Sequence, residues 1–173
     1  MQVAKFSSMK KQQLKETIDF LKSNGITSPE IGIVLGTGLG KLIAEISIEK
    51  EIAYSDIPNF PVATVEFHSG KLIYGSLSGK KVLVMVGRFH LYEGYSPWEV
   101  TYGIRTMQGL GIKNLLISNA AGAINLNYKK GDLMLIEDHI NLQGSSPLAF
   151  QGASNFGNIF ADMLAPYSAA LNT

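Results

Sequence analysis

Residues 31–40 read IGIVLGTGLG, an apolar run of five residues followed at once by three glycines. The run is typical of a buried strand, and glycines after it allow a sharp turn and a close approach of the backbone to a ligand. The same order returns where Val82–Val86 precedes Gly87 and where Leu115–Ile117 precedes residues 119–122. Apolar strands without period-two alternation predict an α/β domain with a central mixed β-sheet flanked by helices on both faces.

The remaining elements of this domain follow from periodicity and turn signals. Leucine and isoleucine side chains at helical spacing predict a helix over about residues 10–23, and Pro97 can begin a second helix that runs to about Leu110. Three runs rich in β-branched and aromatic residues, separated by Ser-Gly pairs, predict two adjacent hairpins. The other expected elements are hairpin strands over 63–67, 71–77 and 81–86, a helix over 40–46, strands over 133–136 and 139–142, and a helix over about 160–171.

Composition narrows the class of protein. Of the 173 residues, 46% are hydrophobic and 17% are charged, as in a folded soluble domain, so we expect a single domain over residues 1–173. The net charge of +1 lacks the excess expected of a protein that binds nucleic acid or a membrane surface. No cysteine is present, which excludes disulfides and thiolate catalysis, and we expect no metal site and no cofactor. No signal peptide or membrane span is recognisable, so we expect a cytoplasmic protein.

The glycine-rich turn at residues 36–40 is the first candidate site. Free backbone N–H groups at the start of a helix favour an anion, and Thr37 adds a hydroxyl donor. The spacing differs from a dinucleotide fingerprint, since Lys41 stands where the third glycine belongs, and from a P-loop, since Leu42 follows Gly40-Lys41. A tight strand-to-helix turn without a ligand explains these glycines equally well.

The second candidate is the run GRFHLYEG at residues 87–94. Arg88 and His90 are two residues apart, so both project to one face if the strand continues. Arginine offers a bidentate fork to phosphate, and histidine can donate to the same anion. Tyr92 and Glu93 follow directly, and ligand sites in α/β sheets gather at such strand ends. This density of functional groups favours an anion site over a solvated arginine.

Three further segments carry weaker signals. Asn119-Ala120-Ala121-Gly122 leaves room for a ligand, although close packing explains that segment better on its own. His68 lies in a turn and is interpreted as exposed, whereas His139 lies in an apolar stretch and is interpreted as structural. The residues alone therefore predict one phosphate or oxyanion pocket, lined chiefly by Thr37, Arg88 and His90.

Taken together, several segments resemble the trimeric purine nucleoside phosphorylase family. They follow one another in family order from Ile31 onward, and the Arg-Phe-His-x-Tyr-Glu-Gly block is the most specific of them. The segments are GTGLG at 36–40, FHSG at 67–70, GRFHLYEGY at 87–95, NAAG at 119–122 and GDLMLIEDHIN at 131–141. Methylthioadenosine phosphorylases are the nearest rivals, but their Arg-His segment differs.

The resemblance implies phosphorolysis of purine nucleosides by inorganic phosphate, giving the free base and (deoxy)ribose 1-phosphate without a metal. It also assigns roles, with His90 and Glu93 as the catalytic residues. The phosphate ligands would be Thr37, Arg88, His90 and the N–H of Ala120, with His68 close by. The nucleoside would meet Tyr92 at the sugar, and Asn119, Ala121 and Gly122 around the base.

The family is a homotrimer in which a neighbouring subunit's phenylalanine completes each site, and Phe160 matches that residue. The match departs from the family at Asn158 and Ile159, where a charged pair is usual, and Thr37 replaces a serine. The family's domain continues beyond Thr173, so we expect an incomplete domain with an exposed apolar sheet face and a half-built base pocket. The preference between 6-oxo and 6-amino purines stays open.

Two other classes of function remain open. One is a nucleotide-binding oxidoreductase domain, which the GxGxG spacing disfavours. The other is an inactive phosphate-binding fragment, which would bind phosphate without turnover.

Overall fold

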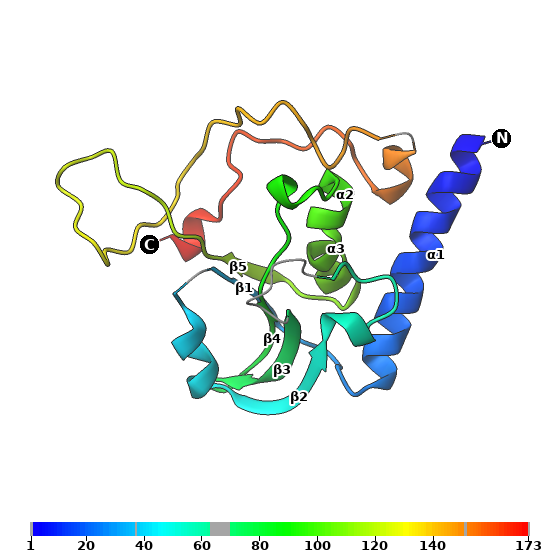
Figure 1. The fold of residues 1–173 in the computed structure, drawn as a ribbon, viewed down its shortest axis with the longest axis horizontal. Coiled ribbons are helices and arrows are strands. Elements are labelled where there is room, and N and C mark those ends of the chain that lie inside the picture. The colour runs from blue at the N-terminus through cyan, green and yellow to red at the C-terminus, as the bar shows by residue number, and fades with distance from the viewer. Residues whose placement is uncertain (1, 37, 63–69, 151, 173) are drawn as a thin grey trace.

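A five-stranded mixed sheet forms the centre of the computed structural model, which describes residues 2–36, 38–62, 70–150 and 152–172 (Figure 1). The order across the sheet is β2-β3-β4-β1-β5. The strands are β1 (Ile31–Leu35), β2 (Ser47–Ala53), β3 (Lys71–Leu77), β4 (Lys80–Val86) and β5 (Asn114–Ile117). The mixed sheet predicted from the apolar runs is therefore confirmed.

Strand direction brings three strand ends to one edge of the sheet. β1 runs parallel to both β4 and β5, whereas β3 is antiparallel to β2 and β4. Leu35 at the end of β1 is paired with Val86 at the end of β4, and Val34 with Ile117 at the end of β5. The loops that carry the candidate site residues therefore leave the sheet side by side.

The expected hairpin between β3 and β4 is confirmed. Its two central residues, Ser78 and Gly79, have φ angles of 48° and 76°. Positive φ at both positions is what a two-residue hairpin turn requires, because it matches the twist of the strands. The first expected strand, 63–67, lies outside the described residues.

The central strands β1, β3 and β4 are buried on both faces, as the continuous apolar strands predicted, whereas β5 is exposed. Alternate residues of β1 face opposite ways: Val34 packs in the larger core cluster with the helices, and Ile33 in a second cluster with Leu42 and Ile43. The α-helices α1 (Gln2–Ser23), α2 (Pro97–Val100) and α3 (Tyr102–Gly109) supply the larger cluster. A 3₁₀ helix at Gly40–Glu45 contributes to the other, where an ordinary helical turn was expected.

The helix expected from Pro97 to Leu110 is divided into two pieces. Ser96 caps α2 through a reciprocal pair of bonds with Glu99, and Pro97 occupies the first turn. The break falls at Thr101, whose hydroxyl donates to the carbonyl oxygens of Pro97 at 2.9 Å and Trp98 at 3.2 Å. Such side-chain bonds compete with the regular helical pattern, which explains a break where the apolar periodicity continues.

A buried tyrosine connects the core to the edge where the parallel strands end. Tyr54 is 1% exposed, and its hydroxyl donates to the carbonyl oxygen of Gly87 at 2.7 Å. Burial raises the pKa of this phenol, so the hydroxyl stays neutral and remains a donor. Its ring packs on Phe60 and Phe89, at centroid distances of 4.8 and 5.4 Å. The backbone of Gly87, directly before the site residue Arg88, is thus held by a side chain of the buried core.

A layered cationic–aromatic cluster joins α1, α2 and α3 to the segment around residue 150. The indole of Trp98 lies 4.1 Å from Lys10 Nζ and 4.4 Å from the Arg105 guanidinium carbon. Phe150 and Phe156 pack on the same indole at 5.3 and 5.0 Å. Stacking of cations on an aromatic face stabilises their partial burial.

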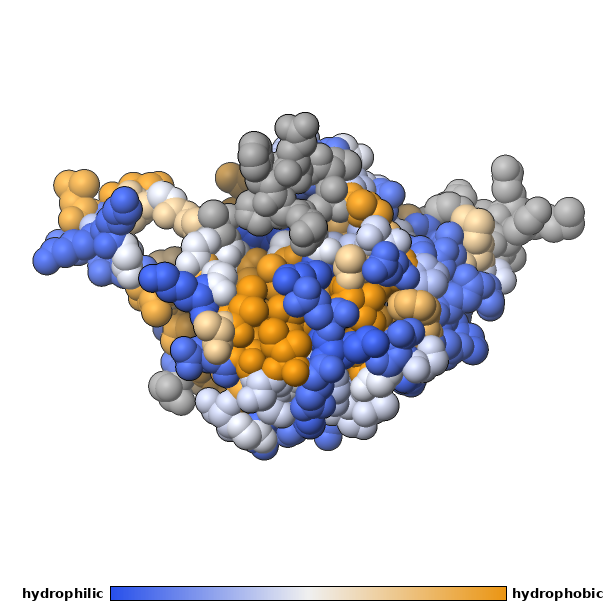
Figure 2. Space-filling view, turned by 60° about the horizontal axis from the view of Figure 1, so that its bottom comes forward, coloured by the Kyte–Doolittle hydropathy of each residue, from blue (hydrophilic) through white to orange (hydrophobic). Residues whose placement is uncertain are grey.

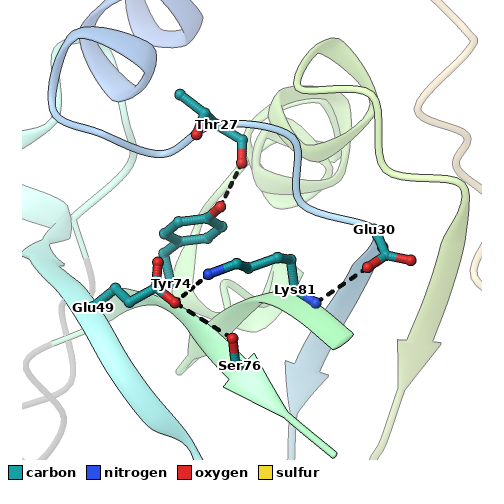
Figure 3. Close-up of polar contacts among 6 residues, drawn as sticks. All are labelled: Thr27, Glu30, Glu49, Tyr74, Ser76 and Lys81. Carbon is teal, nitrogen blue, oxygen red and sulfur yellow. Dashed lines mark hydrogen bonds and ion pairs between the residues drawn. The ribbon is translucent and has the colours of Figure 1, made fainter. Parts of the chain in front are cut away.

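A polar cluster occupies the opposite edge of the sheet (Figure 3). The Tyr74 hydroxyl donates to the carbonyl oxygen of Thr27, and the backbone N–H of Lys81 donates to Glu30 at 3.4 Å. The Lys81 ammonium forms an ion pair with Glu49, which raises the pKa of the lysine and lowers that of the carboxyl. These contacts fasten the link between α1 and β1 to the β3–β4 hairpin.

The strands expected over 133–136 and 139–142, and the helix over about 160–171, are wrong. From Ser118 to Gly152 the described chain has no regular element, and only the 3₁₀ turns Ala153–Phe156 and Ala169–Leu171 follow. Leu133 is 90% exposed and Leu164 is 93% exposed. A strand needs a neighbouring backbone to receive its hydrogen bonds, and these segments pair with none of the described strands.

The expectation of an exposed apolar sheet face is confirmed at β5, whose three apolar side chains are 36–60% exposed. The accessible surface totals 11806 Å², against about 8,300 Å² for a compact monomer of this mass. Ile124 and Leu126, in the loop after β5, are 97% and 98% exposed. Figure 2 shows hydrophobic and hydrophilic residues together on the projection at its left, and a further hydrophobic area near the middle of that face.

Candidate functional site

The candidate site lies where the parallel strands β1, β4 and β5 end. Gly36 follows β1, and its backbone N–H donates to Ser118 Oγ, just after β5, at 2.8 Å. A Cβ placed on Gly36 would lie 2.6 Å from the Ser118 carbonyl oxygen and 2.9 Å from Asn119 Cα. Glycine is therefore required here, because any side chain would push the loops after β1 and β5 apart.

Arg88 joins the loop after β4 to the loop after β5. Its Nη1 donates to the carbonyl oxygen of Ser118 at 2.6 Å, and its Nε donates to His90 Nε2 at 3.2 Å. Phe89, between them in sequence, is 2% exposed and points into the aromatic core. This alternation confirms the prediction that Arg88 and His90 project to the same side.

His90 is held between a cation and an anion. Its Nδ1 is hydrogen-bonded to Glu93 Oε1, and its Nε2 accepts from Arg88. A nitrogen that accepts carries no proton, so the neutral ring has its hydrogen on Nδ1. The ring also stacks on Tyr92, with centroids 4.6 Å apart and an interplanar angle of 15°. Ring orientation and tautomer are thus both set by neighbouring side chains.

A short 3₁₀ turn returns Glu93 to His90. It spans Leu91–Glu93 and ends at Gly94, whose φ of 90° lies in the left-handed region that glycine tolerates. The turn brings the Glu93 carboxylate back to the imidazole three residues earlier, where its side chain is only 4% exposed. Tyr92, on the outer side of the turn, is 80% exposed.

The loop after β5 contributes exposed residues. Asn119 and Ala120 are exposed, and the Asn119 amide donates to the Ala120 carbonyl oxygen at 3.2 Å. Ala121 and Gly122 continue the same exposed stretch. These residues follow directly from Ser118, which Arg88 contacts, so they lie next to the guanidinium–imidazole pair.

The structure thus brings together Arg88, His90, Tyr92 and Glu93 with the start of the loop after β5. Thr37 and His68 lie outside the described residues. Phe160 lies on the surface of this chain, with 82% of its area exposed, and its N–H donates to Asn158 Oδ1 at 2.9 Å. Tyr54 and Ser118 were missed by the sequence analysis, since neither belongs to a recognisable motif.

This arrangement is chemically suited to binding an anion. A guanidinium, an imidazole and the exposed residues that follow β5 lie at one edge, and a buried carboxylate orients the imidazole. Among the described residues there is no cluster of three or more His, Asp or Glu side chains that could hold a metal ion. Within the same ranges, every helix is too short or too polar to cross a membrane.

Comparisons with known proteins identify the family of this chain. Residues 30–173 match the model of the phosphorylase superfamily. Purine nucleoside phosphorylase 1 of Geobacillus stearothermophilus is 50% identical over 163 residues, which are 94% of this chain and 60% of that protein. The enzyme of the same name from Bacillus subtilis is 45% identical over 163 residues, again 94% and 60%.

A solved structure has the same fold. Isoform 2 of purine nucleoside phosphorylase from Schistosoma mansoni, in complex with cytosine and ribose-1-phosphate, superposes with a TM-score of 0.86 at 43% identity. The match covers 93% of this chain and 57% of that one. The chain therefore spans about 60% of the length of the curated relatives it matches.

Proposed function

The chain belongs to the phosphorylase superfamily, and on this premise we propose that its protein is a purine nucleoside phosphorylase. In this reaction an oxygen of inorganic phosphate forms a bond to C1′ of a purine nucleoside while the bond from C1′ to the base breaks. The products are the free purine and (deoxy)ribose 1-phosphate. The observation that carries the proposal is the convergence of Arg88, His90 and Glu93 with the loop after β5, in a chain 50% identical to such an enzyme.

Phosphate would be held by the groups gathered at the strand ends. Arg88 supplies a charged fork and the Ala120 N–H a second donor, and His90 donates to the anion once its Nε2 carries a proton, with Thr37 and His68 completing the set. Glu93 orients His90. As the base departs, positive charge develops on the ribosyl group, and a fixed phosphate anion beside it stabilises that charge. Donors held in place before the reaction do so without further reorganisation.

The nucleoside would lie against the outer side of the same loops. Tyr92 approaches the sugar, and Asn119, Ala121 and Gly122 border the base. Phe160 reaches the site of a neighbouring copy, so the working form is a homotrimer. The exposure of Phe160 in one chain suits that role, since a residue used by a neighbour must be accessible. The reaction needs no cofactor, residues 1–173 form part of one domain, and the enzyme is cytoplasmic.

The test is phosphate-dependent cleavage of inosine, guanosine, adenosine and methylthioadenosine by the full-length gene product. We expect base and pentose 1-phosphate to form from at least one of inosine, guanosine and adenosine, and only when phosphate is present. Cleavage of methylthioadenosine alone would move the assignment to the related phosphorylases. Phosphate binding without turnover of any of the four nucleosides would replace the proposal with a non-catalytic role.

A further inference from the structure

We propose that Ser118 is a positioning residue for the phosphate site. This role rests on the proposed function, because the anion whose binding Ser118 governs is the phosphate of that reaction. Ser118 belongs to none of the recognisable motifs, and it acts through Gly36 and Arg88. Its hydroxyl and its carbonyl oxygen together hold the ends of β1, β4 and β5 at a fixed separation.

The Ser118 hydroxyl closes the gap between β1 and β5. It accepts from the Gly36 N–H at 2.8 Å and donates to the Val34 carbonyl oxygen at 3.2 Å. The Ser118 N–H donates to that same oxygen at 3.0 Å, one residue beyond the last paired position of β5. One side chain thus extends the pairing of the strands into the loops that follow them.

The Ser118 carbonyl oxygen adds the third strand end. It accepts from Arg88 Nη1 at 2.6 Å, while Arg88 Nε remains on His90. A displacement of residue 118 therefore moves the acceptor that fixes the guanidinium. It also moves Asn119 and Ala120, which follow directly in the chain.

The close packing at Gly36 makes the positions of the site residues sensitive to a change at Ser118. The loops after β1 and β5 are so close that a Cβ on Gly36 would overlap the Ser118 carbonyl oxygen. Without the serine hydroxyl, the Gly36 N–H and one lone pair on Val34 lose their partner, and the loops relax apart. The donors then reach phosphate from altered positions, and affinity for the anion falls.

The experiment compares Ser118→Thr with Ser118→Val in the full-length protein, since threonine and valine differ only in the hydroxyl. Binding of inorganic phosphate is measured by calorimetry, and kcat and KM are measured for phosphate and nucleoside separately. Loss of the two hydrogen bonds of the hydroxyl predicts a Kd for phosphate raised about 10-fold in the valine variant, with threonine near wild type. Ser118→Ala serves as a smaller hydroxyl-free variant, so the comparison survives if valine prevents folding.

Ser76→Ala is the matched control. It removes a serine hydroxyl that donates to Glu49 at 3.3 Å on the opposite edge of the sheet, and it should leave phosphate binding unchanged. Equal phosphate affinity in the threonine and hydroxyl-free variants, whatever their melting temperatures, would overturn the positioning role. Failure of the wild type to bind phosphate would overturn it too. A wild type that binds phosphate but cleaves no purine nucleoside would defeat the proposed function alone, and the Kd comparison would still decide the role of Ser118.

Discussion

His90 Nδ1 is hydrogen-bonded to the carboxylate of Glu93, whose side chain is only 4% exposed. The pair fixes which imidazole nitrogen carries the proton and leaves Nε2 facing Arg88. The carboxylate is thus committed to orienting a neighbour, and its removal should affect phosphate more than nucleoside.

Glu93→Ala should lower kcat/KM for phosphate. Hydrogen bonds to charged groups contribute about 1.5–3 kcal/mol, which corresponds to a loss of roughly 10–150-fold. Glu93→Gln keeps an oxygen that can accept from Nδ1–H and should lose less. Steady-state kinetics at varied phosphate give the measurement. Equal losses in both variants would mean that charge, and not orientation of the ring, is what Glu93 supplies.

Arg88→Ala should lose at least about 100-fold in kcat/KM, chiefly through weaker saturation by phosphate, because a preorganised donor to the anion is removed. Arg88→Lys keeps the charge but loses the fork that contacts both Ser118 and His90, so it should recover only part of the activity. Phosphate titrations of the two variants provide the test. Near-normal phosphate saturation in the alanine variant would remove Arg88 from the site.

Gly36→Ala should destabilise the protein by about 1–3 kcal/mol, since the new methyl group would overlap the Ser118 backbone at 2.6 Å. Gly40→Ala is the matched control, because a Cβ on Gly40 meets nothing within 4 Å. Urea denaturation of the two variants measures the difference. If both unfold at the wild-type midpoint, the close approach of the loops after β1 and β5 is not a constraint on the fold.

Tyr54→Phe should cost about 1 kcal/mol of stability and also weaken phosphate binding, since the Tyr54 hydroxyl holds Gly87 directly before Arg88. Tyr74→Phe removes a comparable bond, to Thr27, at the opposite edge of the sheet. We expect similar losses of melting temperature from the two variants but a change in phosphate Kd from the first alone. A shared change in Kd would show that general stability controls the affinity.

The cap of α2 predicts a pH effect on stability. Hydrogen bonds from the Ser96 side chain and backbone lower the pKa of Glu99 below 4.5, and the carboxyl is largely solvent-accessible. Because the folded pKa is depressed, this stabilisation is present at neutral pH and is lost as the pH falls through the folded pKa. Glu99→Gln should therefore flatten the decline in unfolding free energy below about pH 4.5. If the unfolding free energy of the Glu99→Gln variant falls as steeply with pH as that of the wild type, other titrating groups cause the decline.

Local patterns predicted the part of the fold that depends on neighbours in sequence. The buried strands, the β3–β4 turn and the common side of Arg88 and His90 all follow from period, turn chemistry and glycine placement. The strands expected at 133–136 and 139–142 failed for a different reason. An apolar pattern says that a segment suits a strand, whereas pairing depends on whether another backbone lies beside it.

Ser118 shows the same limit within the candidate site. A serine after an apolar run carries no recognisable signal in the sequence. Its position next to Gly36 depends on the pairing register of β1 and β5. The pairing of Val34 with Ile117 places the next residue beside Gly36. Thr101 is a smaller example, since its hydroxyl divides a helix that the apolar pattern treats as continuous.

The pairing of β1 has a consequence for the order of folding. β1 lies between β4 and β5, two partners that come much later in the chain, whereas β3 and β4 are joined by a two-residue turn. Contacts of long sequence separation carry a larger loop-closure cost and form late along the folding route. We therefore expect the strand ends that hold Arg88 and Ser118 to come together only near the end of that route. An anion bound there would stabilise the native state more than the transition state. It would therefore lower the rate constant of unfolding and change the rate constant of folding little.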